Sequence, residues 1–255
     1  MPSFKITVAY DGAPFAGWQR QTNGTSIQGL IEDALRELDD RDVTLNGAGR
    51  TDAGVHAIGQ VASFTLVRDA SPEVIVRSLN AKLPPEIRIL SAAEVPASFH
   101  ARFNPSSKTY RYRIWHADVL NPFERAYAWH IFGPLDIDAM AAAARLVEGC
   151  HDFAAFQTVG GTSGKTERVI TFSRLTATDQ QLVTYEITGN GFLRHMVRAI
   201  VGTLVEVGRG RQRPDWMREV IASRDRMQAG KTAPAHGLFL VRVDYGVIQS
   251  SAHVT

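Results

Sequence analysis

The chain has 255 residues, of which 44% are hydrophobic, and a formal net charge of +2 at pH 7. These values predict a globular protein with one large core or two modest ones, and they exclude a largely disordered chain. A single cysteine, Cys150, excludes an internal disulfide, and no apolar run approaches the roughly 18 residues of a membrane helix. Since the first residues also lack a basic and then apolar export signal, we expect a cytoplasmic protein.

The first part of the chain alternates between strand and helix patterns. Period-2 alternation indicates strands, helical spacing of apolar residues indicates helices, and Ser followed by Pro marks a helix start. The predicted elements are a strand over 4–10, a helix over 27–38, a short strand near 43–45, a strand over 60–67, a helix from Ser71-Pro72 to just before Pro84-Pro85, and a strand over 87–92.

The second part repeats the same order of elements. They are a strand over 109–116, a helix over 138–147, strands over 170–176 and 182–188, a helix over 193–207, an additional helix over 215–223, and a strand over 238–243. Both parts therefore follow the β-α-β-β-α-β order of ferredoxin-like units. We predict an α+β fold of two such subdomains, residues 1–104 and 105–246, with their sheets joined across a central active-site cleft and a loose tail over 247–255.

Among the segments that carry chemistry, Gly49-Arg50-Thr51-Asp52-Ala53-Gly54 sets one carboxylate between glycines and beside an arginine. Glycine allows tight turns and close approach, so Asp52 is predicted to be presented on a loop, with Arg50 helping to hold it ionised. This arrangement suits a nucleophilic or basic aspartate. The alternative is an Asx turn in which Asp52 only caps its own loop.

The predicted strand over 108–113 alternates basic and aromatic residues. Lys108 and Tyr110 would share one face, and Arg111 would point to the other. One face could then stack on a base while the other meets phosphates. The alternative is an amphipathic strand with buried tyrosines and solvated arginines.

The mainly apolar helix predicted around 192–201 places Arg194 and Arg198 one turn apart. A buried arginine requires a carboxylate partner, and we predict that this partner is Asp52. The alternative is an arginine that extends along its aliphatic stem to solvent.

The loop over 208–214 carries Arg209 and Arg211 among glycines, a pattern that suits a phosphate backbone or simply a solvated loop. The segment over 10–20 mixes glycine, aromatic and basic residues, and it could line an RNA groove or close a turn over the core. Asp52 has no second acid beside it for glycosidase chemistry, and the histidines lack ligand spacing. We expect neither a cofactor nor a metal.

Taken together, these segments resemble the tRNA pseudouridine synthase A family. The resemblance spans nearly the whole chain and rests on separate motifs in family order: 10–21, 49–61, 99–103, 108–113, 151–153, 166–170, 191–202 and 234–245. Departures from the family pattern are Lys108, where arginine is common, and Asn104-Pro105 in place of smaller residues.

The resemblance implies isomerisation of uridine to pseudouridine at positions 38, 39 and 40 of the tRNA anticodon stem-loop, by a homodimer that uses no cofactor or metal. The target base must leave its stack, and Arg50 would fill the space it leaves. Asp52 would break the N-glycosidic bond, either by attack on the sugar or the base or by removal of a sugar proton, and the base would rejoin through C5.

The resemblance also implies roles for other residues. Tyr110 would stack on the uracil and could take the C5 proton, Arg198 would pair with Asp52, and Leu238 would pack under the ring. We also place further cations among the substrate-binding residues: Lys108, Arg111, Arg194, Arg209 and Arg211. The main alternative is a non-catalytic RNA-binding protein of paired ferredoxin-like modules, and a carboxylate-dependent hydrolase is a third.

Overall fold

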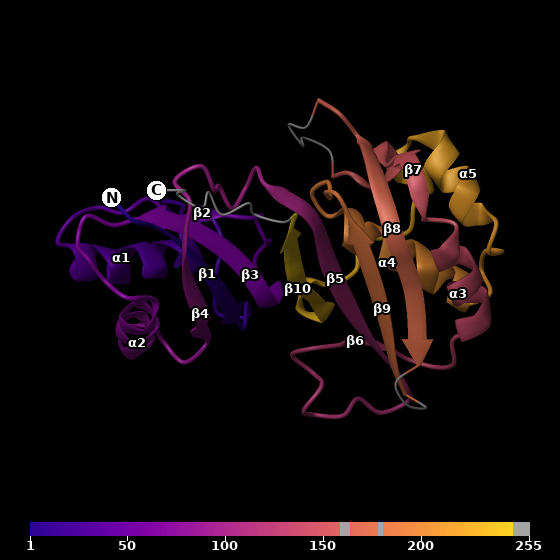
Figure 1. Cartoon of the computed structure of the whole chain (residues 1–255). Coiled ribbons are helices and arrows are strands. Elements are labelled where there is room, and N and C mark those ends of the chain that lie inside the picture. Colours follow the sequence, from indigo (N-terminus) through magenta and orange to yellow (C-terminus); the bar gives the residue numbers. More distant parts are fainter. Residues whose placement is uncertain (159–163, 178–180, 247–255) are drawn as a thin grey trace. The chain divides into compact units, whose positions relative to one another are not determined.

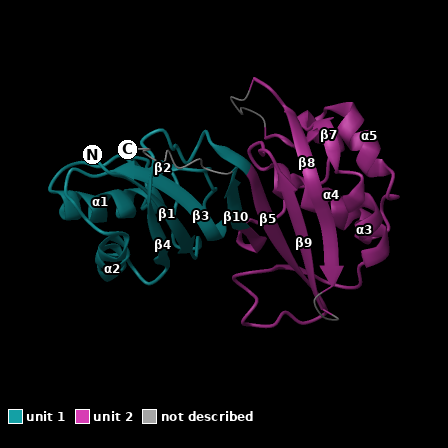
Figure 2. Ribbon diagram, viewed as in Figure 1, with its two compact units in different colours: residues 1–106, 240–255 teal, residues 107–239 magenta. Residues whose placement is uncertain are grey.

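The computed structural model describes residues 1–158, 164–177 and 181–246. The chain forms two compact units (Figure 2). Unit 1 comprises Met1–Ser106 with Leu240–Thr255, and unit 2 comprises Ser107–Phe239. The described residues 240–246 thus group with the N-terminal part, whereas the predicted division at 1–104 and 105–246 followed chain order. That division stays a prediction, and its tail over 247–255 lies outside the described residues.

Unit 1 combines antiparallel strands with two helices (Figure 1). Its elements are β1 (Ser3–Tyr10), α1 (Ile27–Asp39), β2 (Asn46–Gly47), β3 (His56–Thr65), α2 (Pro72–Lys82), β4 (Ile87–Val95) and the part of β10 (Leu238–Tyr245) from Leu240. The strands lie in the order β4-β1-β3-β10, and β2 pairs with β3. Every second residue of β1 is buried, as expected for a strand with one face on a core.

The helices of unit 1 begin where the sequence predicts. The hydroxyl of Ser26 accepts a hydrogen bond from the backbone of Gly29 at the start of α1. The hydroxyl of Ser71 does the same for α2, which has Pro72 in its first turn. Such caps satisfy backbone N–H groups that have no partner inside the helix.

Unit 2 has its own strands and helices (Figure 1). Its elements are β5 (Pro105–His116, with its first two residues in unit 1), β6 (Trp129–Ile131), α3 (Ile137–Arg145), β7 (Gly149–Asp152), β8 (Glu167–Ala177), β9 (Leu182–Gly189), α4 (Met196–Gly208), α5 (Trp216–Ser223), and short 3-10 turns over Ala154–Phe156, Arg226–Gln228 and Ala235–Gly237. The strands lie in the order β5-β9-β8-β7, and β6 runs parallel to β5. Helix α4 is buried along nearly its whole length, which makes it the centre of the unit 2 core.

The α+β class is confirmed, with differences in particular elements. Helix α4 begins at Met196 and not at the predicted Leu193, because His195 adopts a left-handed conformation with φ of 63°. Strand β2 lies at Asn46–Gly47 instead of 43–45. Strands β6 and β7 were not predicted, since three or four residues carry too little periodicity to indicate a strand.

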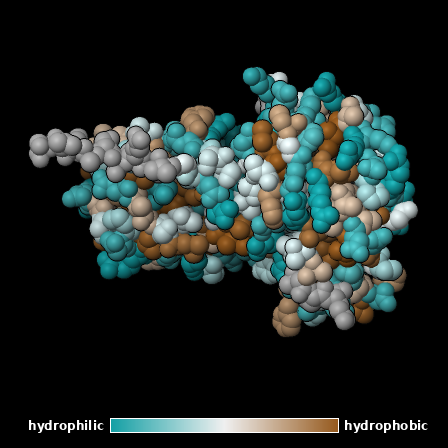
Figure 3. All heavy atoms as spheres, turned by 45° about the vertical axis from the view of Figure 1, so that its right-hand side comes forward, coloured by the Kyte–Doolittle hydropathy of each residue, from teal (hydrophilic) through white to brown (hydrophobic). Residues whose placement is uncertain are grey.

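No described helix has both the length and the apolar character needed to cross a membrane. On the face drawn in Figure 3, hydrophobic side chains are interspersed with hydrophilic ones. Highly exposed large apolar side chains lie outside the strands and α-helices: Met1, Phe103, Val119, Phe123, Phe132 and Met227. Single exposed apolar residues of this kind are normal on a protein surface.

Candidate active site

The loop that carries Asp52 lies in unit 1 between β2 and β3. Asp52 is half-buried and Arg50 is exposed. The backbone carbonyl of Asp52 accepts a hydrogen bond from Val55 N–H at 3.1 Å, and the carbonyl of Thr51 accepts one from Trp18 N–H at 3.1 Å. The carbonyl groups on both sides of the Asp52 α-carbon are thus hydrogen-bonded, which restricts the direction of its side chain.

Side chains from β1 and β3 also hold this loop. The Tyr10 hydroxyl and Thr51 Oγ1 share a hydrogen bond of 2.8 Å, and both residues are buried. Burial raises the pKa of the Tyr10 hydroxyl, although hydrogen bonds with Thr51 and Gln60 oppose the shift, so the hydroxyl stays neutral. Gln60, fully buried, donates from Nε2 to the Gly49 carbonyl at 2.9 Å.

Two glycines allow the loop to lie against neighbouring backbone. A Cβ at Gly12 would come within 2.0 Å of the Val55 carbonyl oxygen. Gly17 has φ of 103°, and a Cβ there would come within 2.8 Å of the Thr51 carbonyl oxygen. The Gly12 N–H donates to Nδ1 of the buried His56 at 3.1 Å. These contacts require backbone without side chains at both positions.

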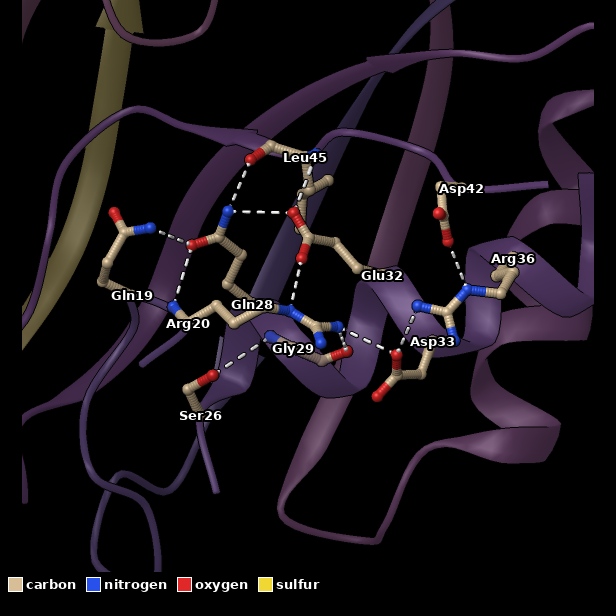
Figure 4. Close-up of polar contacts among 10 residues, drawn as sticks. All are labelled: Gln19, Arg20, Ser26, Gln28, Gly29, Glu32, Asp33, Arg36, Asp42 and Leu45. Carbon is tan, nitrogen blue, oxygen red and sulfur yellow. Dashed lines mark hydrogen bonds and ion pairs between the residues drawn. The ribbon is translucent and has the colours of Figure 1, made fainter. Parts of the chain in front are cut away.

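The segment that contacts Thr51 is itself fixed to the start of α1 (Figure 4). The Gln28 N–H donates to the Trp18 carbonyl at 2.9 Å. The Gln28 side-chain oxygen accepts from the backbone N–H of Arg20 at 3.0 Å, and its amide donates to the Leu45 carbonyl at 3.0 Å. Glu32 pairs with the Arg20 guanidinium at 2.8 Å. Two successive hydrogen bonds therefore connect the Asp52 loop to α1: Trp18 N–H donates to the Thr51 carbonyl, and Gln28 N–H donates to the Trp18 carbonyl.

In unit 2, β5 places Tyr110 and Tyr112 on one buried face. The Tyr110 ring meets the Phe192 ring edge to face, with centroids 5.0 Å apart. The Tyr112 hydroxyl donates to the Pro234 carbonyl at 2.8 Å. Burial raises the pKa of Tyr112, although the charge of Arg198 opposes the shift, so this hydroxyl stays protonated and able to donate.

The segment over 233–238 connects Tyr112, which is not among the predicted site residues, with two residues that are, Arg198 and Leu238. Arg198 donates from Nε to the Ala233 carbonyl at 2.7 Å, and Ala233 N–H donates back to the Arg198 carbonyl at 3.1 Å. A Cβ at Gly237 would meet the Tyr112 ring at 2.6 Å, and the next residue, Leu238, is buried. Arg198 and Leu238 are thus tied to one segment within unit 2.

Several predicted RNA-binding cations form ion pairs within unit 2. Arg111 of β5 pairs at 3.0 Å with Glu186, which lies directly opposite it on β9. Arg209 and Arg211 both face Glu206, at 3.9 and 3.0 Å. Their charge is partly neutralised by these carboxylates.

The two remaining cations lie on separate elements. Lys108 lies on β5 opposite Gly189 and is half-buried. Arg194 is exposed in the turn before α4, so the predicted position one helical turn from Arg198 was wrong. Because the left-handed His195 precedes the first residue of α4, Met196, Arg194 lies outside the helix.

The predicted residues thus fall into two groups, Arg50 and Asp52 in unit 1 and the others in unit 2. Their roles, and the pairing of Asp52 with Arg198, stay predictions. Sequence reasoning missed Tyr10, Thr51 and Gln60 as supports of the loop. The available signal was that Tyr10 ends a predicted strand inside a motif segment. Within the described residues, no three His, Cys, Asp or Glu side chains group as a metal site would require.

Comparison with known proteins shows which family this chain resembles. The family model described as tRNA pseudouridine synthase matches residues 6–104 and 143–246. The chain is 44% identical to "tRNA pseudouridine synthase A" of Moorella thermoacetica over 247 residues, and 46% identical to the protein of that name from Solibacter usitatus over 250 residues. Each alignment covers 96% of this chain and 100% of the relative.

Among solved structures, the chain is similar to a chain in "Crystal structure of the archaeal box H/ACA sRNP Nop10-Cbf5 complex", with a TM-score of 0.37 and 13% identity. That similarity covers 79% of this chain and 44% of the other, and it is too weak to add to the assignment. The family model and the near full-length relatives do not depend on it. The chain belongs to the tRNA pseudouridine synthase family.

Proposed function

We propose that the protein isomerises uridine to pseudouridine at positions 38, 39 and 40 of the tRNA anticodon stem-loop. Membership of the tRNA pseudouridine synthase family, with relatives named tRNA pseudouridine synthase A over their whole length, supports this assignment. The observation that carries it is the agreement between that match and the Asp52 loop. A carboxylate held on a hydrogen-bonded loop beside an arginine fits a reaction that breaks the N-glycosidic bond and forms a new bond from the ribose to C5 of the base, with release of the C5 proton.

In this proposal Asp52 cleaves the N-glycosidic bond, through attack on the sugar or the base or through removal of a sugar proton. Its half-buried position suits such a role, because the carboxylate is partly shielded from water and still open to a substrate. The exposed side chain of Arg50 would enter the stack as the base leaves it.

The groups from unit 2 would act on the extruded base. Tyr110 would stack on the uracil and take the C5 proton, and Leu238 would pack beneath the ring. Arg198 would pair with Asp52. Its hydrogen bond with Ala233 supports this role, because a guanidinium with Nε fixed presents its remaining N–H groups in a set direction.

The binding surface in this proposal includes Lys108, Arg111, Arg194, Arg209 and Arg211. Ion pairs with Glu186 and Glu206 do not oppose this assignment. Partly exposed pairs contribute about 0–1 kcal/mol, so phosphates could replace these carboxylates as partners.

The proposal has a structural part as well. The active-site cleft would lie between two ferredoxin-like subdomains. The protein would act in the cytoplasm as a homodimer, and both protomers would bind the tRNA. The order β4-β1-β3 with β2 on β3 supports the first ferredoxin-like unit.

Release of tritium from tRNA carrying uracil labelled at C5 tests the function, with Asp52→Asn beside the wild type. Isomerisation replaces the C5 hydrogen, so the wild type should release tritium and the variant should not. Release at equal rates would remove Asp52 from the chemistry. Tight tRNA binding without release by the wild type would instead indicate a non-catalytic RNA-binding protein.

A further inference from the structure

The hydrogen bond between Tyr10 and Thr51 links the end of one strand to the residue that precedes Asp52. Tyr10 is the last residue of β1 and lies opposite Ala57 of β3, and the β1–β3 register shifts between Val8 and Tyr10. Irregularities of this kind redirect side chains at the end of a strand. Here the Tyr10 hydroxyl lies at 2.8 Å from Thr51 Oγ1, although the two residues are 41 positions apart.

Both the side chain and the backbone carbonyl of Thr51 form hydrogen bonds. Its side chain meets Tyr10, and its carbonyl accepts from Trp18 N–H at 3.1 Å. A β-branched side chain has few χ1 rotamers, so fixing the hydroxyl also fixes the local backbone. The next residue along that backbone is Asp52, whose own carbonyl accepts from Val55 N–H.

The hydrogen-bonded hydroxyl groups of this pair belong to a buried polar network. Gln60 lies beside the Tyr10 hydroxyl and donates to the Gly49 carbonyl, at the other end of the short segment that leads to Asp52. A buried hydrogen-bond network with its members paired rigidifies the segment it contains. The network therefore holds the segment from Gly49 to Thr51 while Asp52 itself stays accessible.

We propose that Tyr10 and Thr51 are positioning residues that set the direction of the Asp52 carboxylate for the isomerisation. The inference rests on the proposed function of Asp52. Neither Tyr10 nor Thr51 takes part in bond making or breaking. Their hydrogen bond fixes the backbone that presents the carboxylate, and its loss lowers the rate of the chemical step without weakening tRNA binding.

Unit 2 contains a matched control for this pair. The Tyr185 hydroxyl shares a hydrogen bond of 2.8 Å with Ser173 Oγ, and both residues are fully buried. Tyr185→Phe therefore removes the same group from the same kind of environment as Tyr10→Phe. Neither Tyr185 nor Ser173 belongs to the proposed site.

The experiment compares Tyr10→Phe, Thr51→Val and Thr51→Ser with Tyr185→Phe and the wild type. Single-turnover tritium release and tRNA affinity are measured below the melting temperature of every variant. A displacement of about 1 Å can cost a factor of 10² in rate, so we expect Thr51→Val to lose roughly ten- to hundredfold in rate with affinity within about twofold of the wild type. Thr51→Ser, which keeps the hydroxyl, should recover most of the rate.

Tyr10→Phe should also lose rate, whereas Tyr185→Phe should keep the wild-type rate. A Tyr10→Phe protein that keeps the wild-type rate, with a melting temperature lowered only as far as that of Tyr185→Phe, would overturn the proposal. Equal loss in Thr51→Ser and Thr51→Val would also overturn it, because the hydroxyl would then have no part. If the wild type releases tritium and Asp52→Asn does not, either result refutes the positioning role and leaves the proposed function intact.

Discussion

Replacement of Gly12 by alanine should displace the Asp52 loop by an amount that the structure defines. The added Cβ would stand 2.0 Å from the Val55 carbonyl oxygen and 2.5 Å from its carbonyl carbon. Since Cβ atoms in proteins essentially never come within 3.0 Å of another heavy atom, the Val55 carbonyl must retreat by at least roughly 1 Å. Both partners are backbone, so no side-chain rotation can absorb the clash.

This displacement reaches Asp52 through one hydrogen bond. Val55 N–H donates to the Asp52 carbonyl, and moving Val55 either breaks that bond or moves Asp52 with it. A misplacement of about 1 Å can lower a catalytic rate by about 10². We therefore expect Gly12→Ala to lose roughly a hundredfold in single-turnover rate.

The measurement is tritium release from C5-labelled tRNA, with the Gly164→Ala variant as control. A Cβ at Gly164 meets nothing within 4 Å, so it adds the same methyl group without a clash. A folded Gly12→Ala protein with the rate of the control would refute the reasoning, because the contact between residue 12 and Val55 would then not set the position of the catalytic group.

Two further predictions concern stability and binding. The side chain of Asp39 is fully buried, and this burial opposes its negative charge. The Arg68 N–H and the Arg41 guanidinium stabilise the charge, so the pKa of the carboxyl is lowered. Asp39→Asn should lower the free energy of unfolding by about 3 kcal/mol and the Tm by roughly 6–12 °C, whereas Asp40→Asn, at the exposed neighbouring residue, should change the Tm little. A carboxyl whose pKa is lowered by folding stabilises the folded state at pH values above its pKa in the unfolded chain, which is about 3.9. The Tm difference between wild type and Asp39→Asn should therefore shrink as the pH falls below about 4. A Tm difference that stays constant would show that the charge of Asp39 is not the cause of the stabilisation. Arg211→Gln should weaken tRNA binding and reduce the salt dependence of affinity by about one counterion, and an unchanged salt slope would exclude this loop from the interface.

Local signals allowed most elements to be predicted. Ser26 and Ser71 mark helix starts because a hydroxyl can accept from the first turn, which depends on neighbouring residues alone. The start of α4 was missed because Leu193 continues the apolar pattern, whereas His195 is left-handed and its ring pairs with Thr158, 37 residues earlier. Such a contact between distant residues leaves no periodic signal.

The same distinction holds for the site. The amino-acid sequence by itself determined that Asp52 is the candidate catalytic group, because the glycines and the arginine around it are its neighbours along the chain. Only the tertiary structure decided that Tyr10, from β1, supports the residue before Asp52, and that Gly12 must lack a side chain against Val55. The physical reason is that these contacts follow from the pairing of β1 with β3, and strand register is set by the packing of the whole sheet.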